Sequence, residues 1–343
     1  MTYHNLNMNN FWQKFEKPIL ALAPMAGITD SACRQISKKY GADVTYSEMA
    51  SVTALFHKPA KTLKLVGFNK SERPYVVQLF GNKPEHFEKA AKIITKEIKP
   101  DGIDINFGCP AKKVFSHGSG CALMNNIKLS REIIKAVCEN TNLPVSIKIR
   151  AGLKNISALK FIEKTKDLPY SAVMVHGRTY ESSFSGTVDF SLCEQVKKII
   201  PDKIVLANGG IYDPEDAVKI LKTYPLLDGL GIARGAWGRP WIFKQIKQLL
   251  ACHPELACLS DRQVSGSQKI QDRSRNKFGM TKSKIKKIMI EHAKLIYKDK
   301  KELGMFEIRK HLCWYIKGFP GAAELRKKLV LAKSVGEIRK ILK

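Results

Sequence analysis

The sequence predicts an α/β fold, a (β/α)8 TIM barrel followed by a small C-terminal helical domain, and three observations lead to this prediction. Eight short apolar runs recur along the first two thirds of the 343 residues, each followed by a segment with helical periodicity. No GxGxxG fingerprint follows the first run, which disfavours a dinucleotide-binding open sheet. The amino-acid composition becomes polar and basic after about residue 250, and helical periodicity resumes near residue 281.

The apolar runs are rich in Val, Ile and Leu, which is typical of buried parallel strands. They are ILALAP (19–24), DVTYSEM (43–49), YVVQLFG (75–81), GIDINFG (102–108), PVSIKIRAG (144–152), AVMVHGRT (172–179), IVLANGG (204–210) and GLGIARGA (229–236).

Helices are expected between these strands. Residues 84–98 and 214–224 both open with Pro followed by acidic residues, as the first turns of helices prefer. Residues 237–250 are expected to close the barrel as a last helix. Eight β-then-α units of this kind favour a closed barrel over a doubly wound sheet.

The chain divides into three parts in this interpretation. Residues 1–250 form the catalytic barrel, 251–280 form a basic linker or loop, and 281–343 form a helical domain with cationic faces. The helices expected there cover 285–299, 305–318 and 322–342.

The charge indicates a polyanionic partner. Lys and Arg number 59 against 31 Asp and Glu, a net charge of +28, which favours a nucleic acid over a generally lysine-rich composition. The 8 cysteines show no CxxC pair and no spacing typical of metal ligands, so no metal site is expected.

No membrane association is expected. The first residues, MTYHNLNMNNFWQKFEKP, lack a basic start followed by an apolar run, and no stretch approaches about 20 continuous apolar residues. Scattered cysteines suit a reducing compartment. We therefore expect a soluble cytoplasmic protein, and we expect it to be a monomer.

Polar side chains end one predicted strand after another. Because the carboxyl ends of the strands in a (β/α)8 barrel share one mouth, these side chains are expected to point into a single cavity. They are Glu48, Gln78, Asn106, Lys148, His176 and Asn208.

The last two strand ends carry glycines and an arginine. NGGI (208–211) and GIARGAWG (231–238) stand where barrels commonly bind phosphate, and Arg234 adds charge-assisted hydrogen bonds. The pattern predicts an organic phosphate cofactor without saying which.

At this point the motifs resemble those of the tRNA-dihydrouridine synthases, most closely the B-type bacterial branch. The resemblance spans most of the chain. The motifs are APMAGITD, DINFGCPAKKV, IKIRAG, VHGRT, LANGGI, ARGAWGRPWIF and RKHLCWYIKGFPGAAELR.

The resemblance implies an FMN-binding barrel that reduces the C5=C6 bond of particular uridines in tRNA. It implies FMN reduced by NADPH or NADH, hydride delivered to C6 of uracil, and a proton delivered to C5 by a cysteine, here Cys109. A thiol with an ordinary pKa of about 8.5 stays protonated at pH 7 and can act as a general acid. The expected partners are therefore tRNA and NADPH.

The resemblance also assigns roles to the other candidate residues. Asn106 holds the target uracil, while Lys112 and Lys113 belong to the active-site loop and are expected to face RNA phosphate rather than sulfur. The residues implied to bind the cofactor are Pro24, Met25, Ala26, Gln78, Lys148, His176, Asn208, Gly209, Gly210, Ala233 and Arg234.

Two departures from the family pattern stand out. Ala233 occupies a position where the pattern has Gly, and the region 255–280 is longer and more basic than expected. Three alternatives stay open: the same chemistry on ribosomal RNA, a flavin barrel acting on a free pyrimidine, and a non-enzymatic RNA-binding protein.

Overall fold

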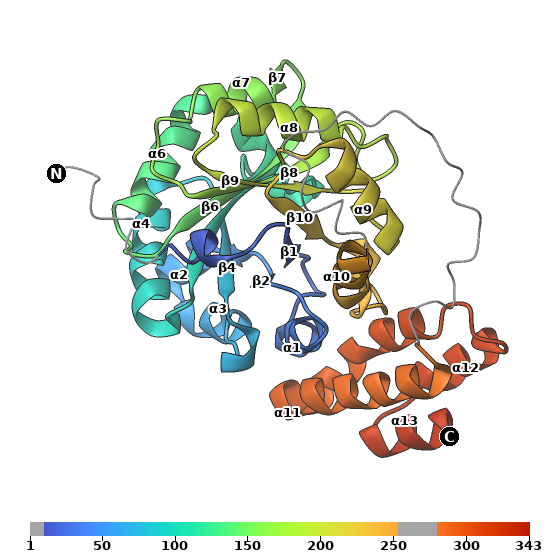
Figure 1. Ribbon diagram of the computed structural model, residues 1–343. Coiled ribbons are helices and arrows are strands. Elements are labelled where there is room, and N and C mark those ends of the chain that lie inside the picture. Colours follow the sequence, from blue (N-terminus) through green and yellow to red (C-terminus); the bar gives the residue numbers. More distant parts are fainter. Residues whose placement is uncertain (1–9, 253–279) are drawn as a thin grey trace, which may run out of the picture.

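The structure is a computed structural model that describes residues 10–252 and 280–343, and it contains the predicted barrel (Figure 1). Eight parallel strands form a closed ring in which β1 pairs with both β2 and β10. The strands are β1 (Ile19–Leu22), β2 (Val44–Tyr46), β4 (Tyr75–Phe80), β5 (Gly102–Phe107), β6 (Val145–Leu153), β8 (Ala172–Thr179), β9 (Ile204–Asn208) and β10 (Gly229–Ile232). Each predicted apolar run coincides with one of them, and only β6 extends beyond its run, by one residue, so the predicted fold class is confirmed.

Helices surround this ring. They are α1 (Ser31–Lys39), α2 (Val52–His57), α3 (Pro59–Leu65), α4 (Pro84–Ile93), α5 (Lys112–Ser116), α6 (Ile127–Cys138), α7 (Ala158–Glu163), α8 (Phe190–Ile199), α9 (Pro214–Thr223) and α10 (Ile242–Cys252). The expected helix at 84–98 continues beyond α4 as one π-helical turn, Ile94–Ile98. Two short strands lie beside the ring, β3 (Ala50–Ser51) and β7 (Ile156–Ser157).

The strand register brings the polar strand ends together. Asn106 of β5 lies beside Lys148 of β6, and His176 of β8 lies beside Asn208 of β9. Below this level the barrel interior is packed mainly by apolar side chains such as Ile19, Tyr46 and Met174, and it also contains the hydrogen-bonded pair Asp104 and Ser146. The mouth therefore stands on a solid core.

The C-terminal helices are α11 (Lys282–Tyr315), α12 (Ala322–Leu329) and α13 (Val335–Leu342). Two of the expected helices, 285–299 and 305–318, form the single run α11, which is broken at Lys301 by non-helical backbone angles (φ 52°, ψ −133°). The third expected helix divides into α12 and α13.

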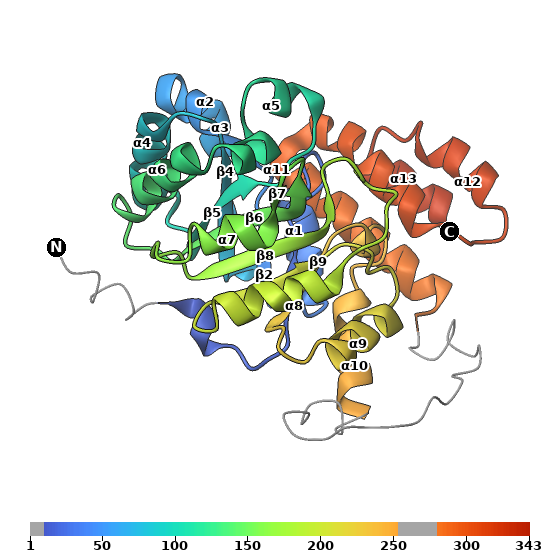
Figure 2. The same ribbon diagram turned by 90° about the horizontal axis from the view of Figure 1, so that it is seen from above.

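The helical domain packs against one side of the barrel, beside α1 and α10 (Figures 1 and 2). Its apolar core includes Ala32 and Ile36 of α1 together with Trp241, which precedes α10. An ion pair between Lys39 and Glu291 lies at the edge of this contact. The proposed linker 251–280 lies almost entirely outside the described residues, and the predicted domain boundaries stay a prediction.

Within residues 10–252 and 280–343, no helix is both long and apolar enough to cross a membrane. No three His, Cys, Asp or Glu side chains in these ranges gather in a way that could hold a metal ion.

Candidate active site

A cavity of about 550 Å³ opens at the carboxyl ends of the barrel strands. Thirteen of the residues singled out in the sequence line it: Pro24, Met25, Ala26, Gln78, Asn106, Cys109, Lys148, His176, Asn208, Gly209, Gly210, Ala233 and Arg234. Glu48, Lys112 and Lys113 are not among the lining residues. Glu48 is buried and accepts a hydrogen bond from the backbone N–H of Gly27, while the two lysines are exposed on α5.

Cys109 lies in the loop that follows β5, and its thiol is partly exposed to the cavity. Burial raises the pKa of this thiol, an effect that a backbone N–H and the cations Arg150 and Lys148 reduce in part. The thiol is therefore protonated at neutral pH. The cations that act on the sulfur come from β6 and not from the lysines that follow Cys109 in the sequence.

A chain of hydrogen bonds ties the cysteine loop to the barrel interior. Asn106 accepts at Oδ1 from the backbone N–H groups of Gly108 (3.0 Å) and Cys109 (2.9 Å), and its Nδ2 donates to Gln78 (2.9 Å). Gln78 in turn donates to Asp104 (2.7 Å). The carboxamide of Asn106 is thus engaged in shaping the loop, and one N–H of Gln78 is left for a group in the cavity.

Asp104 is the inner end of this chain. It is fully buried and also accepts from the hydroxyl of Ser146 at 2.6 Å. Burial raises its pKa to about 7, although both hydrogen bonds and the charge of Lys148 act in the opposite direction. Because Asp104 accepts from Gln78, it fixes which end of the Gln78 amide faces Asn106.

Lys148 provides a cation at the floor of the cavity. Its ammonium donates to Oδ1 of Asn208 at 3.1 Å, and Asn208 donates to the carbonyl of Gly231 at 2.6 Å. Burial, with a contribution from Arg150, lowers the pKa of Lys148 to about 8. The side chain is still cationic at pH 7.

His176 is neutral in this setting. Burial and the neighbouring cations, Lys148 first among them, lower its pKa to about 2. Its Nδ1 lies 3.2 Å from the backbone N–H of Arg178 and accepts from it, so the ring proton resides on Nε2. Nε2 faces the glycine turn formed by Gly209 and Gly210, since a Cβ atom at Gly209 would lie 3.2 Å from this nitrogen.

The glycine turn and two arginines provide an anion site. Gly209 and Gly210 both have positive φ (110° and 65°), which glycine adopts without steric cost. Arg234 lines the cavity together with these glycines, and Arg178 has a buried Nη1 with no hydrogen-bond partner among the described residues. A glycine turn and a guanidinium that line one cavity suit a phosphate group.

Ala233 lines the cavity where the family pattern has Gly. Its φ is −109°, so the methyl group requires no left-handed backbone where the family pattern has Gly.

Two arginines of the site were missed in the sequence. Arg150 donates from Nε to the carbonyl of Gly108 (2.9 Å) and from Nη1 to those of Thr179 (2.9 Å) and Ser183 (3.0 Å), so it joins the cysteine loop to the loop after β8. The sequence spacing could have identified both arginines. Arg150 lies two residues after Lys148, and Arg178 lies two residues after His176. Residues two apart on a strand share one face.

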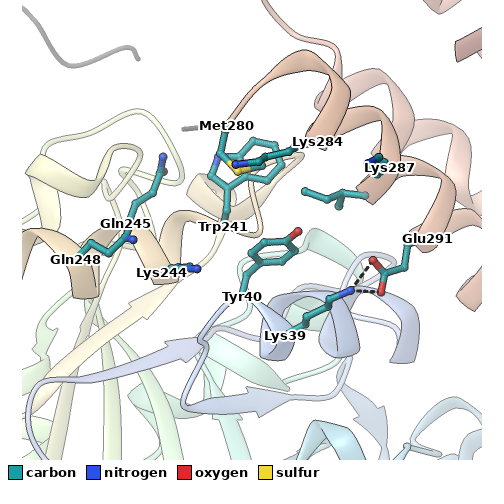
Figure 3. Close-up of a pocket in the computed structure, with 11 residues that line it drawn as sticks. Lys39, Tyr40, Trp241, Lys244, Gln245, Gln248, Met280, Lys284, Lys287 and Glu291 are labelled. Carbon is teal, nitrogen blue, oxygen red and sulfur yellow. Dashed lines mark hydrogen bonds and ion pairs between the residues drawn. The ribbon is translucent and has the colours of Figure 1, made fainter. Parts of the chain in front are cut away.

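A second cavity, of about 590 Å³, lies between α1, α10 and α11 (Figure 3). Trp241, Tyr40 and exposed lysines line it, and none of the predicted site residues does. Of the six polar residues that end the predicted strands, all but Glu48 line the first cavity, and none lines the second.

The fold and the first cavity define a class: a (β/α)8 barrel that can hold an anionic, phosphate-bearing group beside a cationic side chain and a protonated thiol. Two solved structures share the fold. A 2-naphthoyl-CoA reductase is similar with a TM-score of 0.53 at 11% identity, over 67% of this chain and 50% of that one. A histamine dehydrogenase from Rhizobium sp. 4-9 is similar with a TM-score of 0.51 at 14% identity, over 67% of this chain and 45% of that one. At these identities the likeness concerns the fold alone.

Sequence relatives are more specific. A probable tRNA-dihydrouridine synthase of Mycobacterium leprae is 30% identical over an alignment of 352 positions, which covers 92% of this chain and 85% of that protein. The tRNA-dihydrouridine synthase B of Pseudomonas syringae pv. tomato is 33% identical over 313 residues, which cover 90% and 85%.

The model of the dihydrouridine synthase (Dus) family matches residues 21–342, and the chain belongs to this family. Membership implies a flavin-dependent reduction of uridine in tRNA.

Proposed function

We propose that this protein reduces the C5=C6 bond of uridines in tRNA to dihydrouridine, using FMN reduced by NADPH. The observation that carries the proposal is the convergence of Cys109, Lys148, His176 and the glycine turn on one cavity in a chain of this family. When bound and reduced, FMN supplies a hydride to C6 of the uracil, and the overall reaction adds one further proton at C5.

The residues of the chain fit such a group. The glycine turn at 209–210 and Arg234, which line the cavity, would hold the phosphate. The buried Nη1 of Arg178, which has no hydrogen-bond partner among the described residues, would add a donor. Pro24, Met25 and Ala26 would line one side of the ring system. The free N–H of Gln78 would donate to the ring edge.

Lys148 and His176 would act on the electrostatics of the site. A cationic Lys148 would stabilise negative charge that develops on the bound ring system. Because His176 is neutral with its proton on Nε2, it would serve as a hydrogen-bond donor and not as a second cation.

Cys109 would donate the proton to C5. Burial keeps the thiol protonated at neutral pH, so the proton is available when C6 is reduced. Arg150 and Asn106 hold the loop that carries the thiol. Asn106 already makes four hydrogen bonds within the protein, the fourth from Nδ2 to the sulfur of Met49 at 3.7 Å, so it would contact the uracil by exchanging one of them.

The target base must leave its stack to enter the cavity. Lys112 and Lys113, exposed on α5 next to the cysteine loop, would contact the RNA backbone, and the basic C-terminal helices would hold the rest of the tRNA.

The test begins with the purified protein. It is expected to be yellow, to release FMN on heating, and to form dihydrouridine in unmodified tRNA when NADPH is supplied. Ribosomal RNA fragments and free uridine serve as comparison substrates, and faster reduction of either one would replace tRNA in the proposal. A colourless protein that cannot be reconstituted with FMN would refute the flavin assignment.

A further inference from the structure

The loop between β1 and α1 forms one wall of the active-site cavity and contacts the helical domain on its other side. Pro24, Met25, Ala26 and Ile28 of this loop line the cavity. Neighbouring residues of the same loop reach α11, whose sequence lies almost 300 positions further along the chain. The wall of the cavity is therefore shared between two parts of the protein.

The first contact runs through two tryptophans. Trp237 lines the cavity, and its indole N–H donates to the sulfur of Met25 at 3.0 Å. Trp237 also stacks on Trp314 of α11, with ring centroids 4.5 Å apart and ring planes that differ by 12°. Met25, Trp237 and Trp314 thus form a continuous row from the cavity to the helical domain.

The second contact is a lysine. Lys310, one turn before Trp314 on α11, donates from Nζ to the backbone carbonyl of Gly27. The N–H of the same glycine donates to the buried carboxylate of Glu48, so the peptide units on both sides of Gly27 are held by side chains. At the end of the loop, Lys300 of α11 pairs with Asp30 at 3.2 Å.

The third contact is steric. Gly238 follows Trp237 directly and has a positive φ of 64°. A Cβ at this position would lie 2.3 Å from the backbone carbon of Trp314 and 2.5 Å from the backbone nitrogen of Tyr315. The loop that carries Trp237 therefore meets the backbone of α11 without any intervening side chain.

We infer that Trp314 and Lys310 of the helical domain are positioning residues for the flavin site, because they hold the 24–29 loop and Trp237 in the conformation that lines the cavity. The inference rests on the proposed function in that the cavity binds a flavin. It adds that the helical domain completes the cofactor site as well as contacting RNA.

The cluster around Trp241 provides a matched control. Trp241 also lies between the barrel and the helical domain, where it is buried near Tyr315, with ring centroids 6.2 Å apart. It lines the second cavity and not the first (Figure 3). Substitution of Trp241 loosens the same domain contact without touching the row that leads to Met25.

The experiment uses the full-length protein stripped of flavin and titrated with FMN. We expect Trp314→Leu to raise the Kd for FMN about three- to tenfold, the range given by the loss of one aromatic pair, and Lys310→Met to raise it about twofold to threefold. Trp314→Phe should restore much of the affinity, and Trp241→Leu should leave it within twofold of the wild type. An unchanged Kd in both Trp314→Leu and Lys310→Met, or equal weakening by Trp241→Leu, would overturn the inference.

Hydrogen exchange of the flavin-free proteins gives a second readout that does not depend on FMN. Backbone amides of residues 24–29 should exchange faster in Trp314→Leu and Lys310→Met than in the wild type and in Trp241→Leu. If the wild type binds no FMN, the proposed function fails while the exchange data still decide whether α11 positions the loop. Equal exchange in all four proteins would refute the positioning role.

Discussion

The floor of the active-site cavity and the surface of the helical domain hold their positive charges in opposite ways. On the floor, Lys148 and Arg150 are enclosed, and hydrogen bonds direct each one to specific oxygens. On the helical domain most of the cations stand exposed on α11, α12 and α13, although Lys300 and Lys310 contact the barrel. The exposed cations include Lys282, Lys287, Lys294, Lys298, Arg326, Lys327, Lys328, Arg339 and Lys340.

The difference teaches what each region can do. A cation that is buried and tied in place acts on one atom of a ligand, and the loss of one such group cannot be compensated. Exposed cations act together on an extended polyanion, and the loss of one changes affinity only slightly. Substitutions on the floor should therefore change the rate of reaction, and substitutions on the surface should change the salt dependence of RNA binding.

The largest effect is expected at the thiol. Cys109→Ala should retain FMN and tRNA binding but lower dihydrouridine formation by about 100-fold or more, as expected for a lost general acid. Single-turnover assays with reduced enzyme measure this rate. Cys313→Ala removes another partly exposed thiol, outside the cavity, and should leave the rate unchanged. Comparable rates for the two variants would remove Cys109 from the proton-donor role.

Arg150→Met tests whether a tied cation on the floor is indispensable. The variant loses the hydrogen bonds to Gly108, Thr179 and Ser183, so the cysteine loop shifts and the rate should fall about 10- to 100-fold. Arg131→Met is the matched control, because Arg131 makes its hydrogen bonds to Asp167 and Lys164 at the protein surface. The control should keep full activity, and a similar loss in both variants would point to general destabilisation.

Gly238→Ala tests the contact between the two regions. The added methyl meets the backbone of α11 at 2.3 Å and the backbone φ is 64°, so unfolding should be easier by about 2–4 kcal/mol. Gly318 has a φ of 87° but open space around it, so Gly318→Ala should cost only about 1 kcal/mol. Thermal denaturation measures both, and equal losses would show that no close contact exists at Gly238.

The pH dependence follows from Lys148. Its pKa is lowered to about 8, so the side chain is charged below this pH and loses its charge as the pH rises. The rate of flavin reduction by NADPH should therefore fall severalfold between pH 7 and pH 9. Lys148→Arg keeps the charge over this range and should move the decline to higher pH. An identical profile in both proteins would assign the decline to another group.

The smallest effect is expected from surface lysines. Replacing Lys112 and Lys113 by Ala should weaken tRNA binding modestly and reduce the slope of log K against log salt by about 1 to 2. Lys198 and Lys222, exposed at the C-terminal ends of α8 and α9, are the control pair on the opposite face of the barrel. Equal slopes for both double variants would place the RNA elsewhere.

The sequence made the strands and the mouth of the barrel predictable because both follow from local pattern. Apolar runs mark strands, and the residues that end them share a mouth in this fold. Arg150 and Arg178 could have been predicted in the same way. Each lies two residues after a predicted site residue, Lys148 or His176, and residues two apart on a strand share one face.

Other features depend on contacts between distant residues. The stacking of Trp237 on Trp314 joins positions 77 residues apart, and nothing in either local segment specifies its partner. The sequence also did not predict that α11 continues through Lys301. Gly304 packs against Ile296 across the break, and this contact joins residues of the two helical segments. Likewise, only the register of β4 and β5 reveals that Asp104 orients Gln78.

The raised pKa of Cys109 also bears on how the protein withstands oxidants. Peroxides attack thiolates far faster than thiols, so a cysteine that is kept protonated for catalysis is at the same time slow to form a sulfenic acid. Alkylating reagents that select for thiolates should likewise react slowly with it. The burial that keeps the Cys109 thiol protonated for the substrate therefore also protects its sulfur from oxidation.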